Sequence, residues 1–143
     1  MSEQCNRESF MLCGHSFGAA TCVRASQELS SRVTIDCVML YDCWAGALTP
    51  EGRAQGVPTK IPTVTVESGD WASHRWGITN LGTCHYACNF VAPSTAHQSF
   101  ADSSLWAPTF LARANGAMGS GEERHTLHSS VAKVCKGPSS AGP

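Results

Sequence analysis

The chain has 143 residues, 42% hydrophobic and 15% charged, and ten Lys and Arg against eleven Asp and Glu give a formal net charge of −1. This length and composition predict a soluble globular chain with a hydrophobic core of its own. With a net charge near zero, electrostatics imply neither nucleic acid nor an anionic membrane surface as a partner, and no nucleic-acid partner is expected. No apolar run approaches the length of a bilayer span.

The first residues carry no recognisable targeting signal. Met1–Arg7 is polar, where a signal peptide would have an apolar stretch. Ser2 stands where N-myristoylation requires glycine. These residues favour a cytoplasmic location.

Strands and helices are expected to alternate along the chain. Apolar runs predict strands at 9–13, 35–41, 62–67 and 87–92, and amphipathic stretches predict helices at 17–30, 73–82 and 99–115. Glycines and prolines between residues 46 and 58 predict a loop there. Because parallel strands need crossover connections, this order predicts an α/β fold with a mostly parallel sheet of about four strands and flanking helices. Residues 116–143, rich in Gly and Ser, are expected to form a flexible tail.

The most informative motif is Gly14–Gly18, with the letters GHSFG, between the first expected strand and helix. It fits the G-x-S-x-G nucleophile elbow, a tight turn that exposes a serine at the carboxyl end of a strand. Side chains at Gly14 or Gly18 are expected to collide with the neighbouring strand and helix. Ser16 is therefore the candidate nucleophile.

A nucleophilic serine needs a histidine base and a carboxylate that orients it. Asp42 follows the second expected strand, Asp70 the third, and His97 lies in the loop after the fourth. The carboxyl ends of parallel strands meet at one edge of the sheet, where catalytic groups collect. The chain order Ser, Asp, His matches that of α/β-hydrolases, and either aspartate could serve as the acid. Asp70 could instead be a turn or N-cap residue.

Three blocks of sequence carry a resemblance to the platelet-activating factor acetylhydrolase family, the group VII type phospholipases A2. These blocks are Gly14–Thr21 (GHSFGAAT), Leu40–Trp44 (LYDCW) and Ala96–Asp102 (AHQSFAD). The third is the most specific. The chain departs from the usual family pattern at Ala19, Cys43 and Ser99, where glycine, alanine and asparagine are usual, and none of these is a candidate catalytic residue.

The resemblance implies a partial α/β-hydrolase fold, with residues 1–115 forming the C-terminal half of the hydrolase domain. It implies an esterase that removes short or oxidised sn-2 acyl groups from phospholipids, with Ser16 as nucleophile, His97 as base and Asp42 as acid. The backbone N–H of Phe17 would be an oxyanion-hole donor. No metal or cofactor is required. Expected partners are a phospholipid or short-chain ester substrate and a lipid surface.

Two alternatives stay open. One is a generic α/β-hydrolase esterase in which Asp70 is the acid. The other is a truncated, catalytically silent fragment with an interaction role, because few residues precede the first expected strand. Such a half domain would expose an unpaired sheet edge, so the chain is expected to self-associate through that edge.

The eight cysteines are numerous for this length. Cys13, Cys22, Cys37 and Cys43 occupy apolar strand or helix positions and are expected to be small buried hydrophobic residues. The spacing Cys84-His85-x-x-Cys88 could indicate metal ligands, but it has no second paired cluster, and strand-edge residues are the favoured interpretation.

Overall fold

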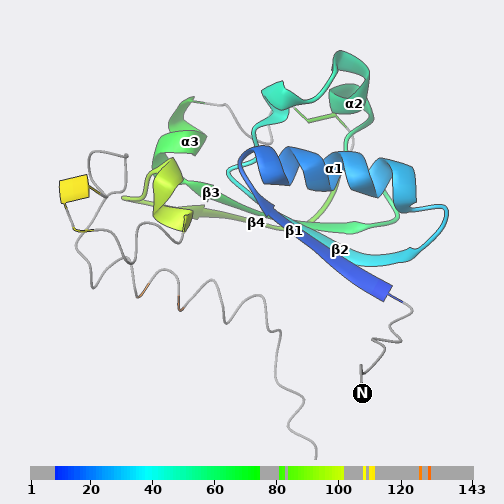
Figure 1. Cartoon of the computed structure of the whole chain (residues 1–143), viewed down its shortest axis with the longest axis horizontal. Helices are drawn as coiled ribbons and strands as arrows, with labels where there is room; N and C mark the ends of the chain where they lie inside the picture. Colours follow the sequence, from blue (N-terminus) through cyan, green and yellow to red (C-terminus); the bar gives the residue numbers. More distant parts are fainter. Residues whose placement is uncertain are drawn as a thin grey trace, which may run out of the picture. The chain divides into compact units, whose positions relative to one another are not determined.

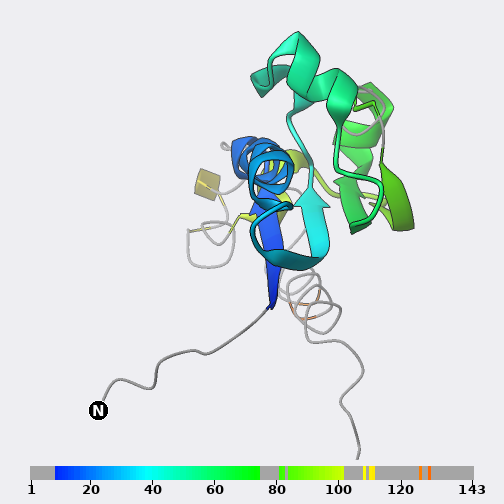
Figure 2. The same ribbon diagram turned by 90° about the vertical axis from the view of Figure 1, so that its right-hand side faces the viewer.

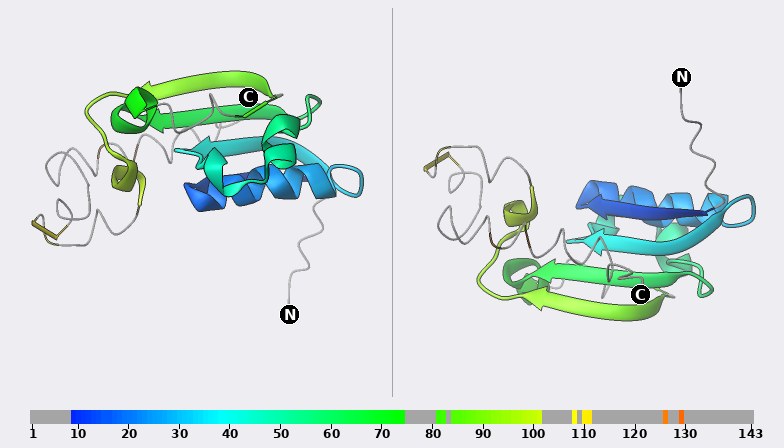
Figure 3. Two further views of the ribbon diagram at one scale, coloured as in Figure 1. Left: turned by 90° about the horizontal axis from the view of Figure 1, so that it is seen from above. Right: turned by 90° about the horizontal axis from the view of Figure 1, so that it is seen from below.

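Four parallel strands lie side by side in the order in which they occur along the chain (Figures 1 and 3). They are β1 (Ser9–His15), β2 (Thr34–Tyr41), β3 (Pro62–Ser68) and β4 (His85–Ala92). The computed structural model describes residues 9–74, 81–82 and 84–101, with residues 108, 110, 111, 126 and 129. The predicted α/β class with a parallel sheet of four strands is confirmed.

Helices α1 (Phe17–Leu29) and α2 (Pro50–Gln55) cover the same face of this sheet (Figures 2 and 3). A right-handed crossover in which each strand is laid beside the previous one places successive helices on one face. Helix α1 buries Ala19, Ala20 and Val23. Its outer side carries the exposed ion pair between Arg24 Nη2 and Glu28 Oε1, at 2.6 Å. This amphipathic pattern explains why the segment packs as a helix on the sheet.

The hydrophobic core lies between this face of the sheet and its helices. Its central strand residues are Val38 and Leu40 of β2, which are 0% and 1% exposed. The buried cluster comprises Ala19, Val23, Ile35, Val38, Leu40, Cys43, Ala45, Val57, Ile61 and Leu81. Gln27 ties α1 to α2, because its Nε2 donates to the carbonyl oxygens of Gly52 and Gly56, both at 2.8 Å.

The cysteine predictions are partly right. Cys43 is buried in the core, and burial raises the pKa of its thiol to about 12. Cys22 and Cys37 are half-buried, whereas Cys13 on β1 is exposed, so the prediction for Cys13 was wrong. Its strand β1 lies at the edge of the sheet, where less packs against it.

The segment between β2 and β3 is more ordered than the predicted loop. It contains a short 3₁₀ helix, η1 (Ala45–Ala47), and then α2. Thr49 is the N-cap, since its Oγ1 accepts a hydrogen bond from Gly52 N at 3.1 Å. Pro50 follows as the first helical residue, a position that suits its fixed φ and missing N–H. Pro50 therefore begins a helix in a segment that was predicted to be a loop.

Two predicted helices also differ from the structure. Helix α3 (Gly69–His74) begins before the expected residue 73, while residues 81–82 are not helical and 75–80 lie outside the described residues. In place of a helix from 99, a 3₁₀ helix η3 (His97–Phe100) ends at an extended Ala101. Pro108 is not helical either, so the prediction of one continuous helix over residues 99–115 was wrong.

The chain divides into two compact units, residues 1–93 and 94–143. The first contains the whole four-stranded sheet, and the second contains η3. The predicted tail at 116–143 lies outside the described residues, apart from Thr126 and Ser129. No helix in the described part of the chain has the length and apolar character needed to cross a bilayer.

Candidate functional site

Ser16 occupies a sharp turn between the end of β1 and the start of α1. Its φ of 57° and ψ of −120° are rare for a residue with a side chain, and such a conformation costs of order 1–3 kcal/mol. The surrounding backbone holds it in place: Ser16 N donates to Tyr41 O at 2.9 Å, and Trp44 N donates to Ser16 O at 3.2 Å. The turn is thereby fastened to the carboxyl end of β2.

The two glycines around this turn are not equivalent. A Cβ on Gly14 would meet backbone atoms of α1, including Ala19 N at 2.7 Å. A Cβ on Gly18 would meet no atom of the described residues within 4 Å. The predicted collision is therefore right for Gly14 and wrong for Gly18. Gly14 faces the crowded contact between strand and helix, while Gly18 lies on the helix with open space beside it.

Phe17 is the first residue of α1, and its backbone N–H has no intrahelical acceptor at that position. The N-terminus of a helix carries a partial positive charge that favours an anion. The Phe17 side chain is 62% exposed, and it lines one end of a groove of about 470 Å³ between α1 and residues 47–52. A developing negative charge beside Ser16 would therefore meet a favourable backbone donor.

Asp42 follows β2 directly, as predicted, and it is 0% exposed. Its carboxylate accepts two short hydrogen bonds from the last residue of β3: Ser68 N to Oδ1 and Ser68 Oγ to Oδ2, both at 2.6 Å. Its backbone has a φ of 41°, and Asp42 N donates to Val66 O at 3.0 Å. The carboxylate is thus buried and held between the ends of two neighbouring strands.

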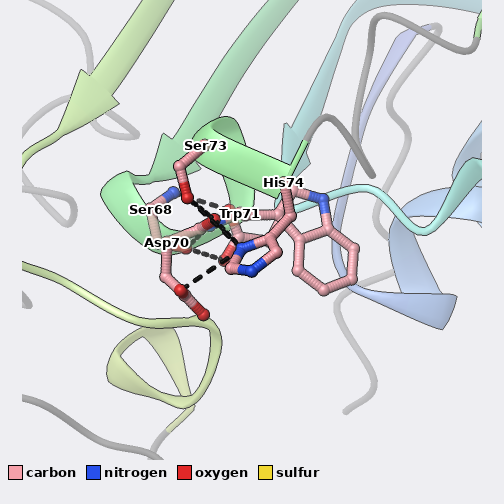
Figure 4. Close-up of polar contacts among 6 residues, drawn as sticks. Ser68, Asp70, Trp71, Ser73 and His74 are labelled. Atoms are coloured by element: carbon pink, nitrogen blue, oxygen red, sulfur yellow. Dashed lines mark hydrogen bonds and ion pairs between the residues drawn. The ribbon is translucent and has the colours of Figure 1, made fainter.

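Asp70 lies in the first turn of α3 and contacts a histidine of the same helix (Figure 4). Its Oδ1 is 3.4 Å from His74 Nδ1, and both side chains are about half exposed. Ser73 Oγ is 3.2 Å from the same nitrogen of His74. A catalytic triad needs the serine and the carboxylate on different ring nitrogens. The set Asp70, Ser73 and His74 therefore does not have the geometry of a triad.

His97 is the first residue of η3 in the second unit of the chain. Two hydrogen bonds shape its loop: Ala96 N to Ser99 Oγ at 3.1 Å and Ser99 N to Ala96 O at 2.8 Å. Ser16, Asp42 and Asp70 all belong to the first unit. The approach of His97 to Ser16 stays a prediction.

Two polar residues lie near Asp42 whose proximity to it was not predicted from the sequence. A ring nitrogen of His15 lies within 4.8 Å of a carboxylate oxygen of Asp42. Ser68 binds both oxygens of that carboxylate. The signal for Ser68 was present, because it is a polar residue at the carboxyl end of a predicted strand, the same criterion that selected Asp42 and Asp70.

The parallel sheet, its flanking helices and the strand–turn–helix around Ser16 define a partial α/β-hydrolase fold. Residues 1–134 match the family model described as platelet-activating factor acetylhydrolase, isoform II, and the chain belongs to this family. No curated protein matches the chain. Family membership supports a hydrolase with an acetylhydrolase-like function on a lipid substrate.

Proposed function

We propose that the chain is a serine esterase that removes short or oxidised sn-2 acyl groups from phospholipids. The observation that carries this proposal is the backbone of Ser16, held at a φ of 57° between β1 and α1 and fastened to the strand end that precedes Asp42. Such strain persists only where the surrounding structure enforces it, and it gathers at functional sites. Family membership supports the phospholipid substrate.

In the proposed mechanism, Ser16 Oγ attacks the ester carbonyl carbon while His97 takes the hydroxyl proton. Asp42 orients His97 and stabilises its protonated ring. The carbonyl oxygen, now negatively charged, accepts a hydrogen bond from Phe17 N–H. The tetrahedral intermediate then expels the lysophospholipid, whose oxygen takes the proton from His97. Water, activated by His97, hydrolyses the acyl-enzyme to release the carboxylic acid and restore Ser16.

Two exposed aromatic side chains beside Ser16 support a substrate presented at a lipid surface. Phe17 is 62% and Trp44 is 49% exposed, and their backbones adjoin that of Ser16. Indole rings favour the boundary between water and lipid because they have an apolar body and a polar N–H. We expect Trp44→Ala to lower sedimentation of the chain with phosphatidylcholine vesicles. Equal sedimentation of both proteins would contradict this part of the proposal.

A fluorophosphonate probe tests the nucleophile, because only an activated serine reacts readily with it. We expect the wild-type chain to be labelled at Ser16 and Ser16→Ala to remain unlabelled. Ser73→Ala is the matched control, since Ser73 also contacts a histidine ring but lacks triad geometry. Labelling that survives in Ser16→Ala and disappears in Ser73→Ala would overturn the proposal.

The same assay tests the acid. Asp42→Asn should slow labelling by several orders of magnitude, since removing the carboxylate of a triad costs about 10⁴ in rate. Asp70→Asn should label at the wild-type rate, because its carboxylate contacts His74 on the exposed surface of α3. The opposite result would transfer the role of acid to Asp70.

A further inference from the structure

Ser68 holds both oxygens of the Asp42 carboxylate. It donates from its backbone N to Oδ1 and from its hydroxyl to Oδ2, each at 2.6 Å, and both residues are 0% exposed. Rotation about the second side-chain torsion of an aspartate is soft. Two donors from one residue, one on each oxygen, fix the plane of the carboxylate. A carboxylate oxygen can accept more than one hydrogen bond, so the bonds from Ser68 do not exclude a histidine donor.

The Ser68 hydroxyl is itself oriented by helix α3 (Figure 4). Trp71 N donates to Ser68 Oγ at 3.2 Å. A hydroxyl has a single proton, and because its oxygen accepts from Trp71, that proton is directed to Asp42. The Trp71 indole Nε1 also donates to Cys43 O at 3.4 Å, next to Asp42 in the chain. Trp71 therefore links the start of α3 both to the end of β3, through Ser68, and to the residue after Asp42, through Cys43.

We propose that Ser68 is a positioning residue for ester hydrolysis, acting through Asp42. It fixes the carboxylate in the orientation from which Asp42 holds the catalytic histidine. This inference rests on the proposed function, in which Asp42 is the acid. Without the hydroxyl, Oδ2 loses a buried donor and the carboxylate can turn about its torsion. A misplacement of about 1 Å in a catalytic site can lower the rate about a hundredfold.

The experiment uses the full 143-residue chain. It measures fluorophosphonate labelling rates and kcat and KM for p-nitrophenyl acetate. We expect Ser68→Ala to lower the labelling rate and kcat about ten- to a hundredfold with KM changed less than about twofold. Ser68→Thr, which keeps a hydroxyl, should restore most of the rate. Ser73→Ala, a serine of α3 outside this network, should match the wild type.

A double-mutant cycle separates positioning from a general structural effect. If Ser68 acts through Asp42, the double variant Ser68→Ala with Asp42→Asn should react at the rate of Asp42→Asn alone. Independent effects would multiply instead, and that result would overturn the inference. If Ser68→Ala does not fold by circular dichroism, Ser68→Cys replaces it, because the thiol is similar in size but a weak donor. A folded Ser68→Cys with the wild-type rate would also overturn the inference.

The outcome for Asp42→Asn distinguishes failure of this inference from failure of the proposed function. Wild-type labelling in Asp42→Asn overturns the assignment of Asp42 as the acid, and no labelling of the wild-type chain overturns the proposed function; in either case the role of Ser68 is overturned as well. Slow labelling in Asp42→Asn with wild-type labelling in Ser68→Ala overturns only the role of Ser68.

Discussion

A methyl group added to Gly14 would test how closely β1 and α1 must approach around Ser16. Its Cβ would lie 2.7 Å from Ala19 N, a backbone atom that cannot turn aside. Ordinary van der Waals contact begins near 3.4 Å, and the backbone O and C of Gly18 would lie closer still. Strand and helix would therefore have to separate by at least roughly 0.7 Å. We expect Gly14→Ala to lower the free energy of unfolding by about 3 kcal/mol. That is a large share of the roughly 5–15 kcal/mol of a typical domain.

Gly18→Ala is the matched control, two residues beyond Ser16 as Gly14 is two before it. The added methyl group meets no described atom within 4 Å, and Gly18 has no positive φ to strain. Alanine favours a helix over glycine by about 1 kcal/mol. Gly18→Ala should therefore leave the free energy of unfolding unchanged or raise it by up to that amount.

Urea denaturation followed by circular dichroism measures both variants. The reasoning requires a difference of at least about 3 kcal/mol between them, with Gly14→Ala the less stable. Fluorophosphonate labelling of Ser16 should fall in Gly14→Ala and persist in Gly18→Ala. Equal free energies of unfolding for the two variants would show that β1 and α1 can separate at little cost, and would refute the predicted effect of Gly14→Ala.

Three further predictions concern the base, the core thiol and the sheet edge. His15 is the rival base, because one of its ring nitrogens lies within 4.8 Å of an Asp42 carboxylate oxygen. We expect His97→Gln to abolish fluorophosphonate labelling and His15→Gln to lower its rate less than about tenfold. The reverse result would assign the base to His15. The pKa of Cys43 is raised from 9.0 to about 12, mainly by burial and further by the nearby Cys84, Cys22 and Glu67. The folded chain therefore keeps a proton on this thiol that the unfolded chain loses above pH 9. The contribution of Cys43 to the free energy of unfolding should therefore be fully present below pH 9 and fall by up to about 1.4 kcal/mol per pH unit above it. Cys43→Ala should make the dependence on pH less steep, and an unchanged slope would disprove the reasoning. Among the described strands, β1 is at the edge of the sheet, and its Phe10 is 49% exposed. Light scattering should therefore show that the wild-type chain self-associates, and Phe10→Lys should reduce this self-association while Leu29→Lys on α1 should not. A monomeric wild-type chain would contradict the prediction.

The sequence alone was enough to predict the four strands, their parallel arrangement and the turn in which Ser16 lies. Each of these depends on neighbouring residues: an apolar run forms β2, and the GHSFG motif marks the turn between β1 and α1. Parallel pairing follows from the alternation of strands and helices, because a crossover must separate parallel neighbours. The placement of Asp42 directly after β2 was confirmed for the same reason.

Helix α2 and the open space beside Gly18 could not be predicted from the sequence, because both depend on which residues pack nearby. Proline and glycine usually interrupt a helix, but Pro50 begins α2 because Thr49 caps it and Gln27 of α1 holds its far end. Gly18 was expected to collide with its neighbours, but the helix places it beside open space. In each case the outcome depends on what packs against the residue.

The environment of Asp42 was decided only by the tertiary structure. Ser68 is 26 residues away in the chain, yet both of its donors reach the carboxylate because β2 and β3 pair with Tyr41 opposite Val66. His15 approaches Asp42 through the pairing of β1 with β2. The local sequence specifies that a strand forms and which polar residue follows it. The register between strands, which depends on packing across the whole sheet, decides which of those polar residues meet.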